Sequence, residues 1–338
     1  MKEIKSIGVA FLGVGRMGET HLRNLAGISG VKVRVVADPN REAAEQGRAI
    51  SGAEAALVEV EQAINYPGVD AVVIITPTST HASLIELAAN AGKAVFCEKP
   101  IALELNETKR IVDLVHERNV PVQLGFMRRF DPGYTAAKAR IAAGDLGKLE
   151  TFRALSRDTY PPSLKFLLGS GGLFLDMAVH DLDLARYLVG EVEEVTAWGS
   201  VLIDERFAQA NDADTAVTLL RFKNGVLGVL ETSRRSNWGY DIRTEVAGSL
   251  GKVVVEAPQK TPLLFATDFK STFDHFENFP DRFEVAYRLE LEAFFESLKE
   301  GRHPEPGPGD ALETLRLALA VTKSWREGRS VKVSEITV

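Results

Sequence analysis

The chain has 338 residues, of which 45% are hydrophobic and 26% charged, and its formal net charge is −7. This length favours two domains of ordinary soluble composition, and the negative charge argues against binding to nucleic acid or to an anionic membrane surface. No apolar window is long enough to span a bilayer, and no signal peptide is visible at residues 1–6. We therefore expect a cytoplasmic protein. The single cysteine, Cys97, excludes an internal disulfide and lies in an apolar run, which favours a buried thiol.

A glycine motif follows the first predicted strand. The apolar run at residues 6–12 leads directly into Gly13-Val14-Gly15-Arg16-Met17-Gly18, which opens a helix. In such a motif the first glycine permits a tight turn, the second lets the backbone approach a pyrophosphate, and the third lets the helix pack on the strand. The amides at the start of the helix then bind the phosphates. The motif in this context predicts a dinucleotide site.

An acidic residue distinguishes between the two nicotinamide cofactors. The strand predicted at residues 31–37 ends at Asp38, about twenty residues beyond the motif, where a carboxylate accepts the adenosine ribose hydroxyls and repels the 2′-phosphate of NADP. We therefore expect NAD. Arg41, on the next helix, could weaken that preference, although a solvated arginine is the commoner explanation.

The alternation of strands and helices continues through the first part of the chain. Repeated strand-helix units of this length indicate a Rossmann-type doubly wound parallel sheet, and we expect an NAD-binding domain at residues 1–124. The further helices are predicted from residue 41, at 82–90 and at 103–118, and the further strands at 71–75, 94–97 and 120–124.

Two of these strands end in unusual polar sequences. Thr76-Pro77-Thr78-Ser79-Thr80-His81 follows one strand and Glu98-Lys99-Pro100 follows the next. Functional residues of such sheets gather at the carboxyl ends of strands. A lysine there can hydrogen-bond a substrate hydroxyl and favour its deprotonation. An ordinary solvated pair at Glu98 and Lys99 is the alternative, and His81 either lies near the dinucleotide or packs.

After residue 124 the pattern changes. A broad, mainly antiparallel sheet is predicted, so we expect an α+β domain at residues 125–338, with helices on one sheet face and often another subunit on the other, as in a dimer or tetramer. The predicted strands are 148–157, 192–203, 215–222, 226–233, 242–247 and 252–256, with hairpin turns at 223–225 and 249–251. The predicted helices are 132–143, 171–188, 282–299 and 310–325, the last with Asp310 as its N-cap.

The helix predicted at residues 171–188 carries a polar stripe. Residues three and four apart share a helical face, which places Asp176, His180, Asp183 and Tyr187 along one line. A carboxylate one turn from an imidazole can orient it and stabilise its protonated form, as a general base requires. A solvent-facing stripe with an ordinary helical Asp-His pair is the alternative.

The remaining candidate residues carry less information. His21 and His116 are interpreted as packing or surface residues, and no set of His, Asp and Glu has a known metal spacing. We therefore expect no metal. Tyr240 lies in a turn-like stretch, where an aromatic residue either packs or contacts substrate.

Taken in order, these motifs resemble those of the GFO/IDH/MocA oxidoreductase family, and the resemblance covers nearly the whole chain. Two further stretches are similar to the branch of that family that oxidises inositols. The family motifs are residues 13–18, Thr76-Pro77 with His81, Glu98-Lys99-Pro100 and the Asp176/His180 helix, and the branch stretches are residues 125–132 and Ser156-Arg157-Asp158 with Pro161-Pro162.

The resemblance implies hydride transfer from a secondary hydroxyl of a cyclic polyol or sugar, above all oxidation of myo-inositol to its 2-keto product in inositol catabolism. It implies Lys99, Asp176 and His180 as the catalytic trio, and a Lys99-Pro100 peptide that can be cis. The implied substrate contacts are those three with Arg129, Asp158, Asp183 and Tyr240, and the implied cofactor contacts are Gly13, Gly15, Arg16, Met17, Gly18, Asp38, Thr76, Pro77, His81, Glu98 and Lys99.

Two alternatives stay open. The substrate could be scyllo-inositol or a pyranose sugar, because ring stereoisomers differ only in which hydroxyls meet which polar groups. The chain could also be a non-catalytic, dinucleotide-binding regulator, because a fold does not determine a function.

Overall fold

The computed structural model describes residues 6–338, and the chain divides into two compact units. The first unit comprises residues 6–130 and 285–313 with residue 338, and the second comprises residues 131–284 and 314–337. The boundary expected after residue 124 lies close to the end of the first segment, whereas residues 285–313 join the first unit from far along the chain. The expectation about a signal peptide rests on residues 1–6, of which residues 1–5 lie outside the described part.

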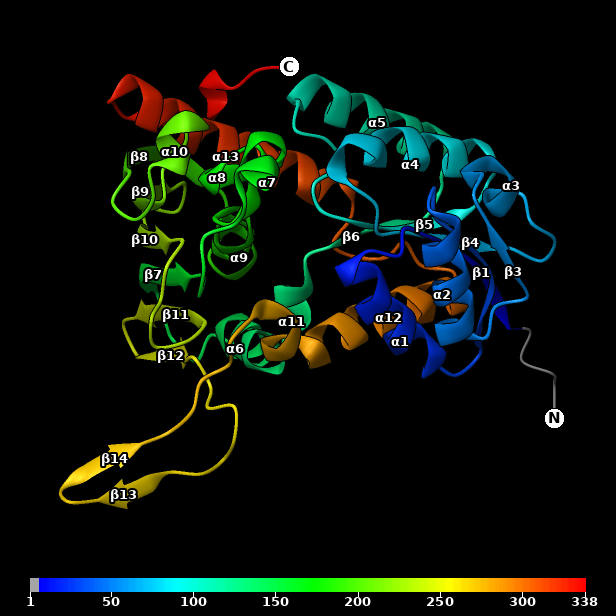
Figure 1. Cartoon of the computed structure of the whole chain (residues 1–338). Helices are drawn as coiled ribbons and strands as arrows, with labels where there is room; N and C mark the ends of the chain where they lie inside the picture. Colours follow the sequence, from blue (N-terminus) through cyan, green and yellow to red (C-terminus); the bar gives the residue numbers. More distant parts are fainter. Residues whose placement is uncertain (1–5) are drawn as a thin grey trace. The chain divides into compact units, whose positions relative to one another are not determined.

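The first unit contains a six-stranded parallel sheet with the order β3-β2-β1-β4-β5-β6 (Figure 1). Its central strands are almost wholly buried apolar runs, as expected of a parallel sheet covered on both faces. The doubly wound prediction is therefore confirmed. The strands are β1 (Ile7–Leu12), β2 (Val31–Ala37), β3 (Ala55–Leu57), β4 (Ala71–Ile74), β5 (Ala94–Glu98) and β6 (Val122–Gly125).

Helices cover both faces of this sheet, with α4 and α5 on one side and α1, α2 and α12 on the other (Figure 1). Leu291, Phe294 and Phe295 of α12 belong to the same buried cluster as Phe11 and Phe96 of the sheet, which explains why this late helix joins the first unit. The helices are α1 (Arg16–Ala26), α2 (Arg41–Ser51), α3 (Val60–Ile64), η1 (Thr78–Thr80), α4 (His81–Asn90), α5 (Leu105–Arg118), η2 (Met127–Phe130) and α12 (Glu284–Lys299).

The second unit is built on a seven-stranded sheet with the order β12-β11-β7-β10-β9-β8-β15. All neighbours are antiparallel except β7 and β10, so the prediction of a mainly antiparallel sheet is confirmed. The strands are β7 (Leu149–Arg157), β8 (Val192–Ser200), β9 (Thr215–Phe222), β10 (Leu227–Ser233), β11 (Asp241–Gly248), β12 (Gly251–Val255) and β15 (Val331–Lys332), and a separate hairpin pairs β13 (Phe265–Thr267) with β14 (Lys270–Thr272).

One face of the seven-stranded sheet is buried and the other is exposed. Along β9 every second residue is buried, while Val217 and Leu219 between them are exposed. Figure 1 shows α7, α8 and α9 together on one side of the sheet. The helices are α6 (Pro132–Ala142), α7 (Leu164–Ser170), α8 (Leu173–Asp176), α9 (Val179–Leu188), α10 (Arg206–Gln209), α11 (Phe279–Arg282) and α13 (Pro308–Glu327), and η3 spans Val333–Glu335.

Three local predictions in the second half are wrong. The single helix expected at residues 171–188 is two helices, α8 and α9, separated at Met177 and Ala178. The strand expected at 192–203 ends at Ser200, because the amides of the next residues bind the Asp214 carboxylate instead. Asp310 is not the N-cap of α13 but lies in its first turn, where its carboxylate accepts a hydrogen bond from the Gly307 N–H.

Within residues 6–338, none of the helices combines the length and apolar character that crossing a membrane requires.

Candidate active site

The glycine motif connects β1 to α1, and its glycines meet different surroundings. Gly13 has a φ of +94°, and a Cβ there would lie 2.5 Å from the Ile75 carbonyl oxygen. A Cβ on Gly18 would lie 2.1 Å from the Gly13 carbonyl oxygen. At Gly15, the N-cap of α1, a Cβ would meet nothing within 4 Å. Packing therefore requires glycine at Gly13 and Gly18, whereas Gly15 leaves open space beside the helix amides, which fits the approach of a pyrophosphate.

Asp38 lies half-buried directly after β2. Its Oδ2 accepts a hydrogen bond from the Val14 N–H at 2.8 Å, and its Oδ1 accepts one from the Asn40 N–H at 2.8 Å. These bonds hold the carboxylate beside the glycine motif, where a dinucleotide's ribose is expected. Arg41 begins α2 and is exposed, and Arg16 and Met17 begin α1.

His81 connects the ends of β4 and β5. One ring nitrogen lies 2.8 Å from the Thr76 carbonyl oxygen and the other lies 2.7 Å from that of Pro100, and the side chain is buried. A neutral imidazole donates only one hydrogen bond. The ring therefore packs between two loops of the predicted cofactor site and donates to one of the two carbonyls when it is neutral. Thr76 and Pro77 belong to the first of these loops.

Glu98 and Lys99 end β5. The Glu98 carboxylate accepts a hydrogen bond from the Lys99 N–H at 3.3 Å, and it packs over Gly125, where a Cβ would lie 2.9 Å from the carboxyl carbon. The Lys99-Pro100 peptide is cis, as the resemblance implied. The Glu98 side chain therefore points into the first unit and leaves Lys99 to begin the loop.

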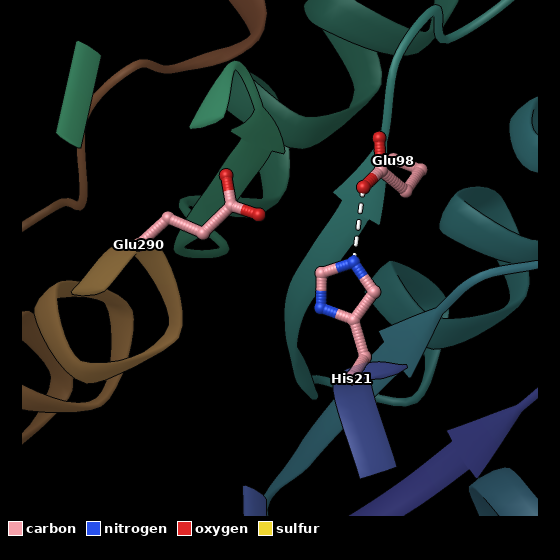
Figure 2. A group of neighbouring side chains, drawn as sticks. All are labelled: His21, Glu98 and Glu290. Atoms are coloured by element: carbon pink, nitrogen blue, oxygen red, sulfur yellow. Dashed lines mark hydrogen bonds and ion pairs between the residues drawn. The ribbon is translucent and has the colours of Figure 1, made fainter. Parts of the chain in front are cut away.

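A cluster of three buried or nearly buried side chains escaped the sequence analysis. His21 Nε2 lies 3.0 Å from Glu98 Oε1, and Glu290 of α12 reaches the same place, so that one donor atom from each lies within 4.8 Å of the others (Figure 2). Burial raises the pKa of Glu290 well above its usual range, and the negative charge of Glu98 is the second cause of this rise. Burial likewise raises the pKa of the buried Cys97 thiol beside them. No sequence spacing relates these residues, so only the fold could reveal the group.

In the second unit, Asp176 ends α8 and His180 lies in the first turn of α9. The bend between the helices means that Asp176 does not belong to the same continuous helical stripe as His180. Asp212 supports this segment, because its carboxylate accepts hydrogen bonds from the N–H groups of Leu173 at 3.0 Å and Ala213 at 2.8 Å. Asp183 is buried and accepts a hydrogen bond from Thr314 Oγ1 at 3.3 Å.

Arg234, which the sequence analysis missed, connects two of the predicted site carboxylates. It follows β10, its side chain is 4% exposed, and it donates to Asp158 Oδ2 at 2.9 Å and to Asp176 Oδ2 at 2.8 Å. Burial lowers the pKa of Arg234, but the negative charges of Asp176 and Asp158 outweigh that effect and raise the pKa above its ordinary value. The position of Arg234 directly after the strand predicted at residues 226–233 was the one signal that could have found it.

The two remaining predicted substrate residues lie in different units. Arg129, on η2 of the first unit, donates to Asp310 Oδ1 at 3.0 Å. Tyr240, in the second unit, is buried, and its ring meets that of Phe283 edge-on at 6.3 Å.

Comparisons with known proteins agree with this organisation. Residues 7–126 match the oxidoreductase family with an NAD-binding Rossmann fold, and residues 134–254 match the GFO/IDH/MocA C-terminal domain. The chain is 40% identical to the scyllo-inositol 2-dehydrogenase (NAD⁺) of Bacillus subtilis, over 96% of this chain and 95% of that one. It is 39% identical to the myo-inositol 2-dehydrogenase of Thermotoga maritima, over 97% of this chain and 99% of that one.

A solved structure has the same fold over almost the whole chain. The scyllo-inositol dehydrogenase of Lactobacillus casei, crystallised with NAD(H) and scyllo-inositol, superposes with a TM-score of 0.92 at 30% identity, covering 98% of this chain and 100% of the other.

Proposed function

Because the chain belongs to the GFO/IDH/MocA oxidoreductase family, we propose that it oxidises a secondary hydroxyl of a cyclic polyol with NAD as the hydride acceptor, and that myo-inositol is the substrate. The product is then the 2-keto compound, in a step of inositol catabolism. The observation that carries this proposal is the similarity, over almost the full length, to inositol dehydrogenases from two organisms.

In the proposed reaction His180 takes the proton of the substrate hydroxyl and Asp176 orients His180. Lys99 hydrogen-bonds the same oxygen and stabilises the negative charge that develops on it. NAD, when bound, would accept on its nicotinamide ring the hydride that leaves the carbon bearing this hydroxyl. The ion pair between Arg234 and Asp176 supports these roles, because the charge-assisted hydrogen bond fixes the position of the Asp176 carboxylate.

The other substrate hydroxyls are proposed to bind Arg129, Asp158, Asp183 and Tyr240. The cofactor is proposed to bind along the glycine motif and the strand ends of the first unit, through Gly13, Gly15, Arg16, Met17, Gly18, Asp38, Thr76, Pro77, His81, Glu98 and Lys99. In terms of the chain, residues 1–124 form the proposed NAD-binding domain, and residues 125–338 the proposed substrate-binding and oligomerisation domain.

A second candidate substrate is scyllo-inositol. The scyllo-inositol dehydrogenase of Bacillus subtilis is as similar to this chain as the myo-inositol enzyme of Thermotoga maritima, at 40% and 39% identity. The two substrates differ in the orientation of one hydroxyl, which a site distinguishes through its polar contacts.

The experiment that tests the function follows NADH formation by the purified chain with NAD and, separately, myo-inositol, scyllo-inositol and glucose. The proposal predicts the highest kcat/KM with myo-inositol. A higher value with scyllo-inositol or glucose would support the corresponding alternative. Binding of NAD in calorimetry without turnover of any polyol would contradict the enzymatic proposal and favour a regulator.

We also propose that the protein acts in the cytoplasm as a homo-oligomer, a dimer or tetramer. The support for the oligomer is the exposed face of the seven-stranded sheet, where Trp198 and Val217 are paired across β8 and β9 and Leu219 and Leu227 lie nearby on β9 and β10, all of them exposed. An apolar face of this kind on a sheet is a common interaction surface. Light scattering on the purified chain tests the proposal, which a monomeric mass would contradict, and the variant Leu219→Lys should lower the mass.

A further inference from the structure

Two carboxylates and an imidazole meet beside the carboxyl end of β5. His21 comes from α1, Glu98 from β5 and Glu290 from α12, and Figure 2 shows the three side chains converging. His21 and Glu290 have no exposed surface. Two aromatic rings pack against His21: the ring centroid of Phe96 lies 5.7 Å and that of Tyr287 lies 5.4 Å from the centroid of the His21 ring.

Hydrogen bonds account for only part of this cluster. Glu98 Oε1 lies 3.0 Å from His21 Nε2, and Glu98 Oε2 accepts from the Lys99 N–H at 3.3 Å. Among the residues that the structure describes, His21 Nδ1 and both carboxylate oxygens of Glu290 are buried without a hydrogen-bonding partner. Gln123 of β6 donates to the backbone carbonyl of Glu290 at 2.8 Å, which holds this turn of α12 against the sheet.

Two ionised carboxylates cannot share such a place at low cost. An unpaired buried charge is expensive, and the second carboxyl group escapes that cost by holding a proton or by binding a cation. A cation is the poorer solution here. His21 Nε2 already lies beside Glu98 Oε1, and the group offers ligands from only three residues, whereas structural zinc takes four.

A proton on Glu290 satisfies two of these three atoms, His21 Nδ1 and the Glu290 oxygen that carries the proton. When His21 donates to Glu98 through Nε2–H, its Nδ1 atom is an acceptor that needs a donor. A protonated Glu290 has an O–H group that can be this donor. One ring nitrogen and one Glu290 oxygen lie within 4.8 Å, a distance that a side-chain rotation or one bridging water closes.

We propose that Glu290 is a neutral carboxylic acid that donates a hydrogen bond to His21 Nδ1, and that Glu290 and His21 are positioning residues that hold the Glu98 carboxylate and, through it, the backbone of Lys99. In this hydrogen-bond chain the Glu290 O–H donates to His21, and His21 Nε2–H donates to one oxygen of Glu98. The Lys99 N–H donates to the other oxygen of Glu98. Its effect on turnover rests on the proposed function, because that function gives Lys99 its role. The rise in the pKa of Glu290 is consistent with the neutral form.

The first test is infrared spectroscopy of the full chain at neutral pH. The carbonyl stretch of a protonated carboxylic acid should be present, should disappear in Glu290→Gln, and should persist in Glu296→Gln, which alters an exposed residue of the same helix. Absence of the band, its persistence in Glu290→Gln, or a stoichiometric metal ion that Glu290→Gln loses would overturn the proposal. None of these readouts requires turnover, so the result stands even if no polyol is oxidised.

The second test concerns positioning. Glu290→Leu removes the donor and should lower kcat about 10- to 100-fold with a smaller change in the KM for NAD, because small displacements of a reacting group have effects of this size. Glu290→Gln keeps an N–H donor and should retain kcat within a few-fold of the parent, a rescue that a merely structural role does not predict. Equal kcat values for the parent and Glu290→Leu would overturn the positioning role. Should Glu290→Leu fail to fold, His21→Asn provides the same comparison, because it shortens the donor to Glu98.

Discussion

Arg234 and Asp176 form an ion pair in which the guanidinium donates to the carboxylate over 2.8 Å, and the arginine side chain is only 4% exposed. The same guanidinium donates to Asp158 over 2.9 Å. One buried cation thus determines the positions of a predicted catalytic carboxylate and of a predicted substrate-binding carboxylate, which lie 18 residues apart (176 − 158) in the sequence.

Arg234→Met should destabilise the protein and lower its turnover. The substitution removes a buried cation from two partly exposed carboxylates, at a cost of roughly 3 kcal/mol in the free energy of unfolding, the low end of the range for breaking a buried ion pair. Urea unfolding measures this cost and kcat measures the second effect. The control is Arg221→Met, which removes the ion pair between an exposed arginine and the half-buried Glu194 and should cost less than about 1 kcal/mol. Equal effects of the two substitutions would contradict the role of Arg234.

His180→Ala should lower kcat by about 10²- to 10⁴-fold, the usual contribution of a general base. The measurement is the steady-state rate of NADH formation with the best polyol substrate. His116→Ala, which alters an exposed histidine of α5, is the matched control and should leave kcat unchanged. A loss of less than tenfold for His180→Ala would mean that another group takes the proton.

Asp38→Ala should shift the cofactor preference from NAD toward NADP. The substitution removes charge-assisted hydrogen bonds to the ribose hydroxyls, typically about 1.5 to 3 kcal/mol, whereas NADP loses only a repulsion. The bond from the Val14 N–H to Asp38 is also lost, but that loss affects both cofactors.

The measurement for Asp38 is the ratio of kcat/KM for NAD to that for NADP, with Asp113→Ala on α5 as the control. The ratio should fall about 10- to 100-fold in Asp38→Ala, which corresponds to the free energies above. A parent that already prefers NADP, or an unchanged ratio, would show that Asp38 does not bind the ribose.

Asp212 should make the stability of the protein pH-dependent. Burial raises the pKa of Asp212 above its ordinary value of 3.8, although the N–H groups of Leu173 and Ala213 oppose the rise. The folded state then binds the proton more tightly than the unfolded state, so this contribution to the free energy of unfolding is present at low pH and is lost as the pH rises through the folded pKa. Asp212→Asn lacks that titration. As the pH rises, its free energy of unfolding should therefore increase relative to that of the parent.

Urea unfolding of Asp212→Asn and the parent between about pH 4 and pH 7 measures this difference. Asp204→Asn is the control of opposite sign, because hydrogen bonds from Arg206 lower the pKa of Asp204 to about 2. Its contribution is present above the ordinary pKa and is lost only as the pH falls, so the Asp204 difference should be flat above about pH 5. The prediction would be contradicted if the free energy of unfolding of Asp212→Asn decreased relative to that of the parent as the pH rises.

Much of the first unit could be predicted from the sequence because its signals are local. Gly13 needs a positive φ and Gly18 has no room for a Cβ, and both requirements arise within a few residues of the motif or from the adjacent strand. The buried runs of a parallel sheet and the acid that ends β2 are local features as well. The prediction of one helix at residues 171–188 failed because periodicity does not register a bend at Met177 and Ala178, where α8 ends and α9 has not begun.

The sequence by itself determined the two fold classes, the glycine motif with Asp38, and the polar residues that end β4 and β5. Tertiary structure alone decided which distant side chains meet. Arg234 reaches Asp158 across 76 residues, and Glu98 reaches His21 across 77. Glu290 joins them because the apolar face of α12 packs into the core of the first unit. The physical reason is that neighbouring residues along the chain determine a strand or a turn. The partner of a buried charged group, by contrast, depends on which distant side chain the packing brings next to it.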